Sequence, residues 1–314
     1  MSLAFTFPGQ GSQAVGMGAE LADAFAASRE VFQEVDDALG QKLSKLIREG
    51  PIEDLTLTEN AQPALMAVSL AVVRALKSEY GVDITRAAFV AGHSLGEYSA
   101  LAAAEAIGIA ETSRLLKLRG QAMQQAVPVG QGAMASLIGP KADVALAEQA
   151  AKAGSAAGVC VVANDNNAGN VVISGDKAAV DLAIEKAKEL GARAILLNVS
   201  APFHCPLMQP AADEMAEALA HAEILAPKAP VVANVTARPV LEPASIRRLL
   251  VEQVTGRVRW RESVEWMAGE GGVTRVAELG AGKVLTGMAK RINPDVEALA
   301  LNAPADLEAF AKSL

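Results

Sequence analysis

Short apolar runs alternate along this chain with longer amphipathic stretches. Runs that predict buried strands lie at 3–7, 89–92, 231–235 and 273–279. Elsewhere apolar residues recur every three or four positions, which predicts helices at 21–35, from Pro63 near a first helical position to about residue 76, at 111–125 and from Pro243 onward. Strands that alternate with helices are typical of an α/β protein built on a parallel sheet.

The middle of the chain has a different order of elements. After a linker at 128–132, the pattern predicts strand, helix, strand, strand, helix and strand. These segments lie at 133–138, 141–153, 159–163, 171–174, 176–190 and 193–199. The order β-α-β-β-α-β is that of a ferredoxin-like unit. We therefore predict a small ferredoxin-like domain over 127–199, inserted into a large α/β domain formed by 1–126 and 200–314.

Composition and charge narrow the class of protein. The chain has 314 residues, 51% of them hydrophobic, which is enough for a substantial core. A formal net charge of −8 argues against nucleic acid as the main partner. We expect no membrane span and no secretory signal, and therefore a cytoplasmic protein. Two cysteines, Cys160 and Cys205, predict neither a disulfide framework nor a metal site, and no bound cofactor is expected.

A serine between two glycines follows the second predicted strand. Residues 92–96 read Gly-His-Ser-Leu-Gly and fit the pattern G-x-S-x-G. In this pattern the serine occupies a strained turn between a strand and a helix, where only small neighbours fit. The N–H of the next residue, Leu95, then points to where an oxyanion would form. An incidental serine in a glycine-rich turn is the alternative, but the strand before Ser94 and the helix after it favour a nucleophile.

The loop after the first strand allows two interpretations. Residues 9–14 formally fit G-x-G-x-x-A, a dinucleotide-binding pattern, but no acidic residue clearly ends a second strand at the expected distance. The other interpretation is a tight loop whose backbone N–H groups face an anion.

Arg119 and His204 are the other candidates for chemistry. Arg119 shares an apolar helix face with Leu115, so either its stem packs while its head reaches water, or its guanidinium awaits a carboxylate. His204 lies in a loop bracketed by prolines between the two predicted domains, and is a better candidate base than His93 or His221. Cys205 is expected to be buried and inert.

Basic residues stand out in the C-terminal third of this acidic protein. They are Arg247, Arg248, Arg257, Arg259 and Arg261. They form either a solvated face or a docking surface for an acidic partner.

Five motifs, in this order, together resemble the malonyl-CoA:acyl carrier protein transacylases of fatty acid synthesis. They lie at 8–13 (Pro-Gly-Gln-Gly-Ser-Gln), 92–97 (Gly-His-Ser-Leu-Gly-Glu), 118–120 (Leu-Arg-Gly), 202–204 (Pro-Phe-His) and 251–253 (Val-Glu-Gln). The resemblance spans essentially the whole chain. It implies an α/β-hydrolase-like large domain with an inserted ferredoxin-like small domain, in agreement with the pattern of elements.

The resemblance also implies roles for individual residues. Ser94 would be the acylated nucleophile and His204 its general base, with Gln253 orienting His204 through a carbonyl. The backbone N–H groups of Gln10 and Leu95 would form the oxyanion hole.

Further residues would bind the acyl group. Arg119 would hold the malonyl carboxylate, and Gln62 would lie near the malonyl group. Asn164 would line the cleft from the small domain, with Asn166 as the alternative. Phe203 would crowd an α-methyl group and so favour malonyl over methylmalonyl.

The implied reaction is a ping-pong transfer of malonyl from malonyl-CoA to the thiol of holo acyl carrier protein. Carrier proteins of this kind are acidic, and the carrier would come from a separate chain and dock on the arginines named above. A monomer is expected. The alternatives are an esterase, a nicotinamide-binding protein that uses 9–14, or a related transacylase of polyketide synthesis or malonate decarboxylation.

Overall fold

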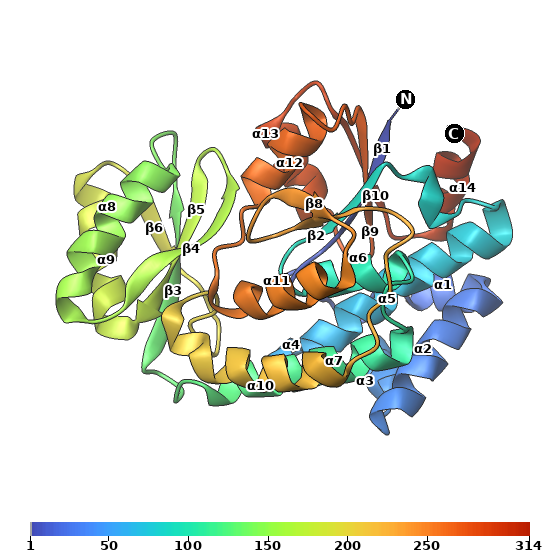
Figure 1. The fold of residues 1–314 in the computed structure, drawn as a ribbon, viewed down its shortest axis with the longest axis horizontal. Coiled ribbons are helices and arrows are strands. Elements are labelled where there is room, and N and C mark those ends of the chain that lie inside the picture. Colours follow the sequence, from blue (N-terminus) through green and yellow to red (C-terminus); the bar gives the residue numbers. More distant parts are fainter. Residues whose placement is uncertain (1) are drawn as a thin grey trace.

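Two sheets, each with its own helices, make up the structure (Figure 1). The computed structural model describes residues 2–314. The larger sheet contains β1 (Leu3–Phe7), β2 (Phe89–Gly92), β7 (Val231–Ala233), β8 (Arg238–Val240), β9 (Arg275–Leu279) and β10 (Glu297–Leu301). Their order across the sheet is β10-β9-β1-β2-β7-β8, and all neighbours pair in parallel except β7 and β8.

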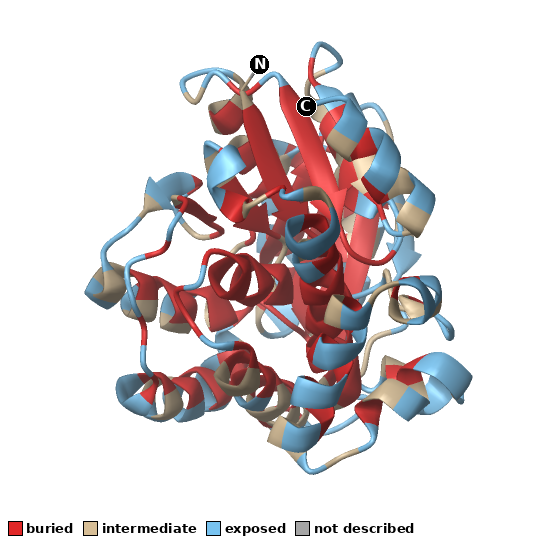
Figure 2. Cartoon of the chain, turned by 90° about the vertical axis from the view of Figure 1, so that its right-hand side faces the viewer, coloured by how far each residue is buried: buried red, intermediate tan, exposed pale blue. Residues whose placement is uncertain are grey.

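Helices cover both faces of this sheet, so its central strands are buried on both sides (Figure 2). Phe5 and Phe7 face the larger core, which is built with α5 (Thr58–Tyr80), α6 (Leu95–Ala103) and α14 (Pro304–Lys312). Outside α5 lie α2 (Ala26–Leu39) and α7 (Ile109–Gln125). Ala4 faces the opposite core, formed with α12 (Trp260–Ala268) and α13 (Val284–Ile292).

The second sheet is the predicted ferredoxin-like unit. It contains β3 (Gly132–Ile138), β4 (Cys160–Asn167), β5 (Asn170–Asp176) and β6 (Arg193–Leu196), in the antiparallel order β4-β5-β3-β6. Its alanine-rich core packs under α8 (Val144–Gly154) and α9 (Lys177–Glu189). Met134 and Val172 point the other way and join the core of the large domain. The predicted fold class is confirmed, whereas the predicted boundaries at 127 and 199 stay a prediction.

The remaining elements are short or lie on the outside. They are α1 (Ala19–Ala24), α3 (Leu43–Glu49), α4 (Ile52–Thr56), α10 (Gln209–His221), α11 (Pro243–Thr255), and the 3-10 turns η1 (Ile84–Arg86), η2 (Ser155–Ala157) and η3 (Pro206–Met208). None of the helices among residues 2–314 combines the length and apolar character that crossing a membrane requires.

Several predicted boundaries were wrong. The single helix expected at 21–35 is two helices, because Phe25 adopts extended backbone angles between α1 and α2. Pro63 lies inside α5, which begins at Thr58, so the tertiary packing of this buried helix tolerates one missing N–H donor. The strands expected at 193–199 and 231–235 end at Leu196 and Ala233.

Candidate active site

A cavity of about 340 Å³ lies between the two domains, at the carboxyl ends of β1 and β2. This edge of a parallel sheet is the usual place for ligands in open α/β proteins. The large domain contributes the loop after β1, the turn after β2 and α13, and the small domain contributes Met134, Asn164, Asn166 and Val172. Ser94, Arg119 and His204 all line this cavity.

Ser94 sits in a strained turn between β2 and α6. Its φ of 53° lies in the left-handed region that non-glycine residues rarely adopt. A Cβ on Gly92 would overlap the carbonyl of Gly96, and a Cβ on Gly96 would overlap the carbonyl of Phe7. Both glycines are therefore required for this close approach, as the pattern G-x-S-x-G predicts.

His204 is placed to accept the proton of Ser94. Its Nε2 lies 2.8 Å from Ser94 Oγ, and its Nδ1 lies 2.9 Å from the main-chain oxygen of Gln253. Burial, followed by the nearby Arg119 guanidinium, lowers the pKa of His204 to about 3. The imidazole is therefore neutral near neutral pH, with its proton on Nδ1, donated to the Gln253 carbonyl, and its Nε2 lone pair free for the serine hydroxyl.

Arg119 is buried at the floor of the cavity, with 1% of its surface exposed. Its Nη1 donates to Gln62 Oε1 at 2.8 Å, and its Nη2 donates to Gln253 Oε1 at 2.9 Å and to Ser94 Oγ at 3.2 Å. Among residues 2–314 no carboxylate forms a direct ion pair with it. The alternative in which its head reaches water is wrong, and a buried cation beside the serine is open to an anionic ligand.

The two expected oxyanion donors also face the cavity. Leu95 is the first residue of α6, and Gln10 lies in the loop after β1. Within the described part of the chain, neither backbone N–H donates to a protein acceptor. The N–H of Ser94 is different, because it donates to Asn234 Oδ1 at 2.8 Å and is not available to a ligand.

Three more expected residues line the cavity walls. Asn164 and Asn166 both reach it from β4, and Asn166 Oδ1 lies 2.9 Å from Nε2 of His93. Phe203 borders the cavity next to His204, with 9% of its surface exposed.

The glycine-rich loop at 9–14 does not have the geometry of a dinucleotide site. That geometry needs a helix to begin at the loop, whereas α1 begins only at Ala19.

Cys205 contacts the Pro202 carbonyl, and burial raises the pKa of its thiol, so it is not an activated nucleophile. Within residues 2–314, no three His, Cys, Asp or Glu side chains group as metal ligands.

Sequence reasoning missed Asn234, which follows β7. Its Oδ1 accepts the Ser94 N–H and its Nδ2 donates to the Gly92 carbonyl at 2.7 Å, so it braces the serine turn from a neighbouring strand. The sequence shows only that Asn234 is a polar residue within an apolar run. The predicted strand at 231–235 included this residue, so its position at the end of the strand was not recognised.

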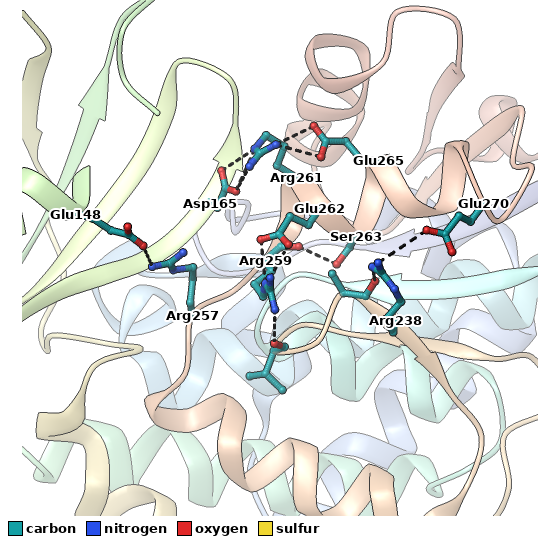
Figure 3. Close-up of polar contacts among 12 residues, drawn as sticks. Glu148, Asp165, Arg238, Arg257, Arg259, Arg261, Glu262, Ser263, Glu265 and Glu270 are labelled. Carbon is teal, nitrogen blue, oxygen red and sulfur yellow. Dashed lines mark hydrogen bonds and ion pairs between the residues drawn. The ribbon is translucent and has the colours of Figure 1, made fainter. Parts of the chain in front are cut away.

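The expected docking arginines are largely engaged within the chain (Figure 3). Arg261 pairs with Asp165 of the small domain and with Glu265, while Arg257 pairs with Glu148. Arg259 pairs with Glu262, and Arg248 with Glu252. The fifth, Arg247, donates to the carbonyl of Ala222. Arg257 and Arg261 therefore connect the two domains, and a docking role for the five arginines stays a prediction.

Comparisons with known proteins agree with this geometry. The acyl transferase domain family matches residues 4–292. The malonyl CoA-acyl carrier protein transacylase of Bacillus subtilis (strain 168) is 45% identical over 313 residues, which cover 99% of this chain and 97% of that protein.

Two solved structures have nearly the same fold. The acyl-carrier-protein-S-malonyltransferase from Bartonella henselae has a TM-score of 0.97 and 53% identity, covering 100% of this chain and 99% of that one. A malonyl-transacylase in complex with its type II PKS acyl-carrier protein has a TM-score of 0.96 and 42% identity, covering 100% of both chains.

Proposed function

The chain belongs to the acyl transferase domain family, and from that membership we propose that it transfers malonyl from malonyl-CoA to the thiol of holo acyl carrier protein. The observation that carries the proposal is the placement of a buried Arg119 guanidinium 3.2 Å from the hydroxyl of Ser94, which itself contacts His204. A nucleophile, a base and an unpaired cation then meet in one cavity.

The first half of the reaction loads the enzyme. Ser94 Oγ attacks the thioester carbonyl of malonyl-CoA while His204 Nε2 takes the hydroxyl proton. The tetrahedral oxyanion is held by the N–H groups of Gln10 and Leu95. When the C–S bond breaks, the imidazolium returns its proton to the coenzyme A sulfur, leaving a malonyl ester on Ser94.

The second half runs the same steps in reverse with a different thiol. His204 takes the proton of the phosphopantetheine thiol, the sulfur attacks the ester carbonyl, and Ser94 Oγ regains the proton as it leaves. The third position needs only the neutral carbonyl of Gln253, because it orients the Nδ1–H of an imidazole that is charged only transiently.

Arg119 selects the acyl group. A guanidinium so close to Ser94 Oγ suits a short diacid, whose far carboxylate lies only a few bonds from the ester. An acyl group without that carboxylate would leave the guanidinium with only uncharged groups in direct contact, which is less favourable. Phe203 at the cavity wall disfavours a methyl branch next to the ester, and so favours malonyl over methylmalonyl.

We also propose a docking face for the acidic carrier on α13. Val284 and Met288 of this helix line the cavity; Lys290 and Arg291 are exposed near its end, and Lys283 is exposed just before it. No carboxylate within residues 2–314 pairs with these three cations, in contrast to the arginines of Figure 3. Unpaired cations on and beside a helix that lines the cavity would attract an acidic protein and bring its thiol close to the cavity. The finer expectations of a cytoplasmic, monomeric enzyme without a bound cofactor stay predictions.

Intact mass spectrometry after mixing with malonyl-CoA tests the function. The wild type is expected to gain one malonyl group, and the Ser94→Ala variant none. Ser99→Ala removes another hydroxyl from the same helix, outside the cavity, and should keep the adduct. The adduct should disappear when holo carrier is added; loss in water alone at the same rate would instead indicate an esterase.

A further inference from the structure

Glu97 is a buried acid beneath the serine turn, outside the cavity. It lies in the first turn of α6, and 2% of its surface is exposed. Its Oε2 accepts two hydrogen bonds: from the backbone N–H of Asn234 at 3.0 Å, and from Gln253 Nε2 at 2.8 Å. Glu97 does not line the cavity, so it acts on the reaction only through these neighbours.

The contact with Glu97 helps to set which way the Gln253 amide faces, together with the donation of the same Nε2 group to the Ser94 carbonyl at 3.0 Å. An ionised carboxylate only accepts hydrogen bonds, so the Nε2 group must point toward Glu97. The amide oxygen then points the other way, where it accepts from Arg119 at 2.9 Å. The main-chain carbonyl of the same residue accepts from His204. Gln253 therefore contacts the acid, the substrate-binding cation and the base.

The arrangement also balances charge inside the protein. Arg119 and Glu97 are both buried, and the Gln253 amide lies between them with its donor toward the anion and its acceptor toward the cation. A lone buried charge would be far less favourable than this bridged pair.

The charges around Glu97 are few. Arg119 of α7 is the cation that acts on it, Tyr98 is its neighbour on α6, and β7 and α11 present the uncharged Asn234 and Gln253. Burial outweighs these favourable contacts and raises the pKa of Glu97 to about 7. Both forms of the acid are then accessible near neutral pH.

We propose that ionised Glu97 is a positioning residue, which orients Gln253 and thereby holds Arg119 and His204 in place for acylation of Ser94. The inference rests on the proposed function. When Glu97 is protonated, its O–H can donate to the amide oxygen of Gln253. The amide then turns its Nε2–H groups toward the N–H groups of Arg119, where donor faces donor and the arrangement is lost.

The test is the pH dependence of acylation in the 314-residue chain. The rate of adduct formation on Ser94 is measured by quenched mass spectrometry between about pH 5.5 and 9. A malonyl thioester without a phosphate is used, so that the substrate itself does not titrate in this range. The wild-type rate should rise with pH through a step near pH 7. A step that came from His204 instead would persist in a variant that lacks the Glu97 carboxyl group.

The variant Glu97→Gln should behave at every pH as the wild type does at the bottom of its step. We expect a loss of at least about tenfold at pH 8 and no step near pH 7. Glu252→Gln, an exposed acid next to Gln253 on the same helix, should keep both the rate and the step. Thermal unfolding of each variant checks the fold.

Two results for folded Glu97→Gln would overturn the inference: an unchanged pH step, or a rate at pH 8 within threefold of the wild-type rate. Adduct formation by the wild type would still support the proposed function. If Glu97→Gln does not fold, the absence of a step in the wild type overturns the inference. Failure of the wild type to form an adduct at any pH overturns the proposed function and the inference with it.

Discussion

The guanidinium of Arg119 lies 2.9 Å from the side-chain oxygen of Gln253, whose main-chain oxygen in turn lies 2.9 Å from Nδ1 of His204. One glutamine therefore contacts both the cation that selects the acyl group and the base that activates Ser94. The cation contacts the side chain of Gln253 and the base contacts its main chain, so one residue positions both groups through separate atoms. Substrate selection and proton transfer therefore both depend on the placement of this one residue of α11.

Removing the cation should change selectivity more than it changes chemistry. In Arg119→Ala the malonyl carboxylate is buried without its partner, which should cost about 2–5 kcal/mol of stabilisation. The value of kcat/KM for malonyl-CoA should therefore fall by roughly 30-fold to a few thousand-fold. Acetyl-CoA has no such carboxylate and should be affected far less. Steady-state transfer with both thioesters measures this ratio. Arg114→Ala, an exposed arginine on the same helix, is the control. Equal losses for both substrates would contradict the assigned role.

Phe203 should restrict branching next to the thioester. Replacing it with alanine opens space at the cavity wall, so the preference for malonyl over methylmalonyl should fall by about 10- to 200-fold, the range for one methyl group in a tight pocket. A competition assay with both thioesters reports the preference directly. Leu207→Ala changes a half-buried residue of the following 3-10 turn η3, outside the cavity, and should leave the preference unchanged. Comparable turnover of both thioesters by the wild type would remove the basis of this prediction.

Reversing charge on α13 should weaken carrier recognition alone. The double variant Lys290→Glu/Arg291→Glu should lower kcat/KM for holo carrier by about tenfold at low salt, through a slower association rate, and the effect should shrink as salt screens the charges. Transfer to free pantetheine should not change. The matched control is Lys152→Glu/Lys188→Glu, on exposed helix faces of the small domain. If kcat/KM for holo carrier fell in the control but not in the α13 variant, the carrier would not dock on α13.

The ion pair between the domains should contribute to stability. Asp165 is 1% exposed in its side chain and pairs with Arg261, which is 30% exposed. In Arg261→Gln the buried carboxylate loses its cation, and the free energy of unfolding should fall by about 2–3 kcal/mol, below the value for a fully buried pair because water reaches the arginine. Urea unfolding measures the change. Arg248→Gln breaks an exposed pair and should cost less than about 1 kcal/mol. Similar values for the two variants would show that the contact between the domains is energetically unimportant.

Much of the local structure was predictable from the sequence. The turn around Ser94 was predictable because Gly92 and Gly96 are required by contacts within a few residues and by one neighbouring strand. The small domain was predictable because each of its elements has its own hydrophobic periodicity, and the order of the elements restricts the topology. The break between α1 and α2 at Phe25 was not predictable, because the hydrophobic periodicity continues on both sides of this extended residue.

The arrangement of the site was decided by tertiary structure. Ser94 and His204 are 110 positions apart, and Gln253 is 159 positions from Ser94. From periodicity alone, the head of Arg119 could have reached water or a ligand, because its environment comes from α5 and α11, not from its own helix. The roles of Asn234 and Glu97 could not be read from the sequence for the same reason, although Asn234 is a polar residue in an apolar run and Glu97 ends the motif at 92–97. Hydrogen bonds within an element follow from neighbouring residues, whereas the meeting of distant side chains depends on how whole elements pack.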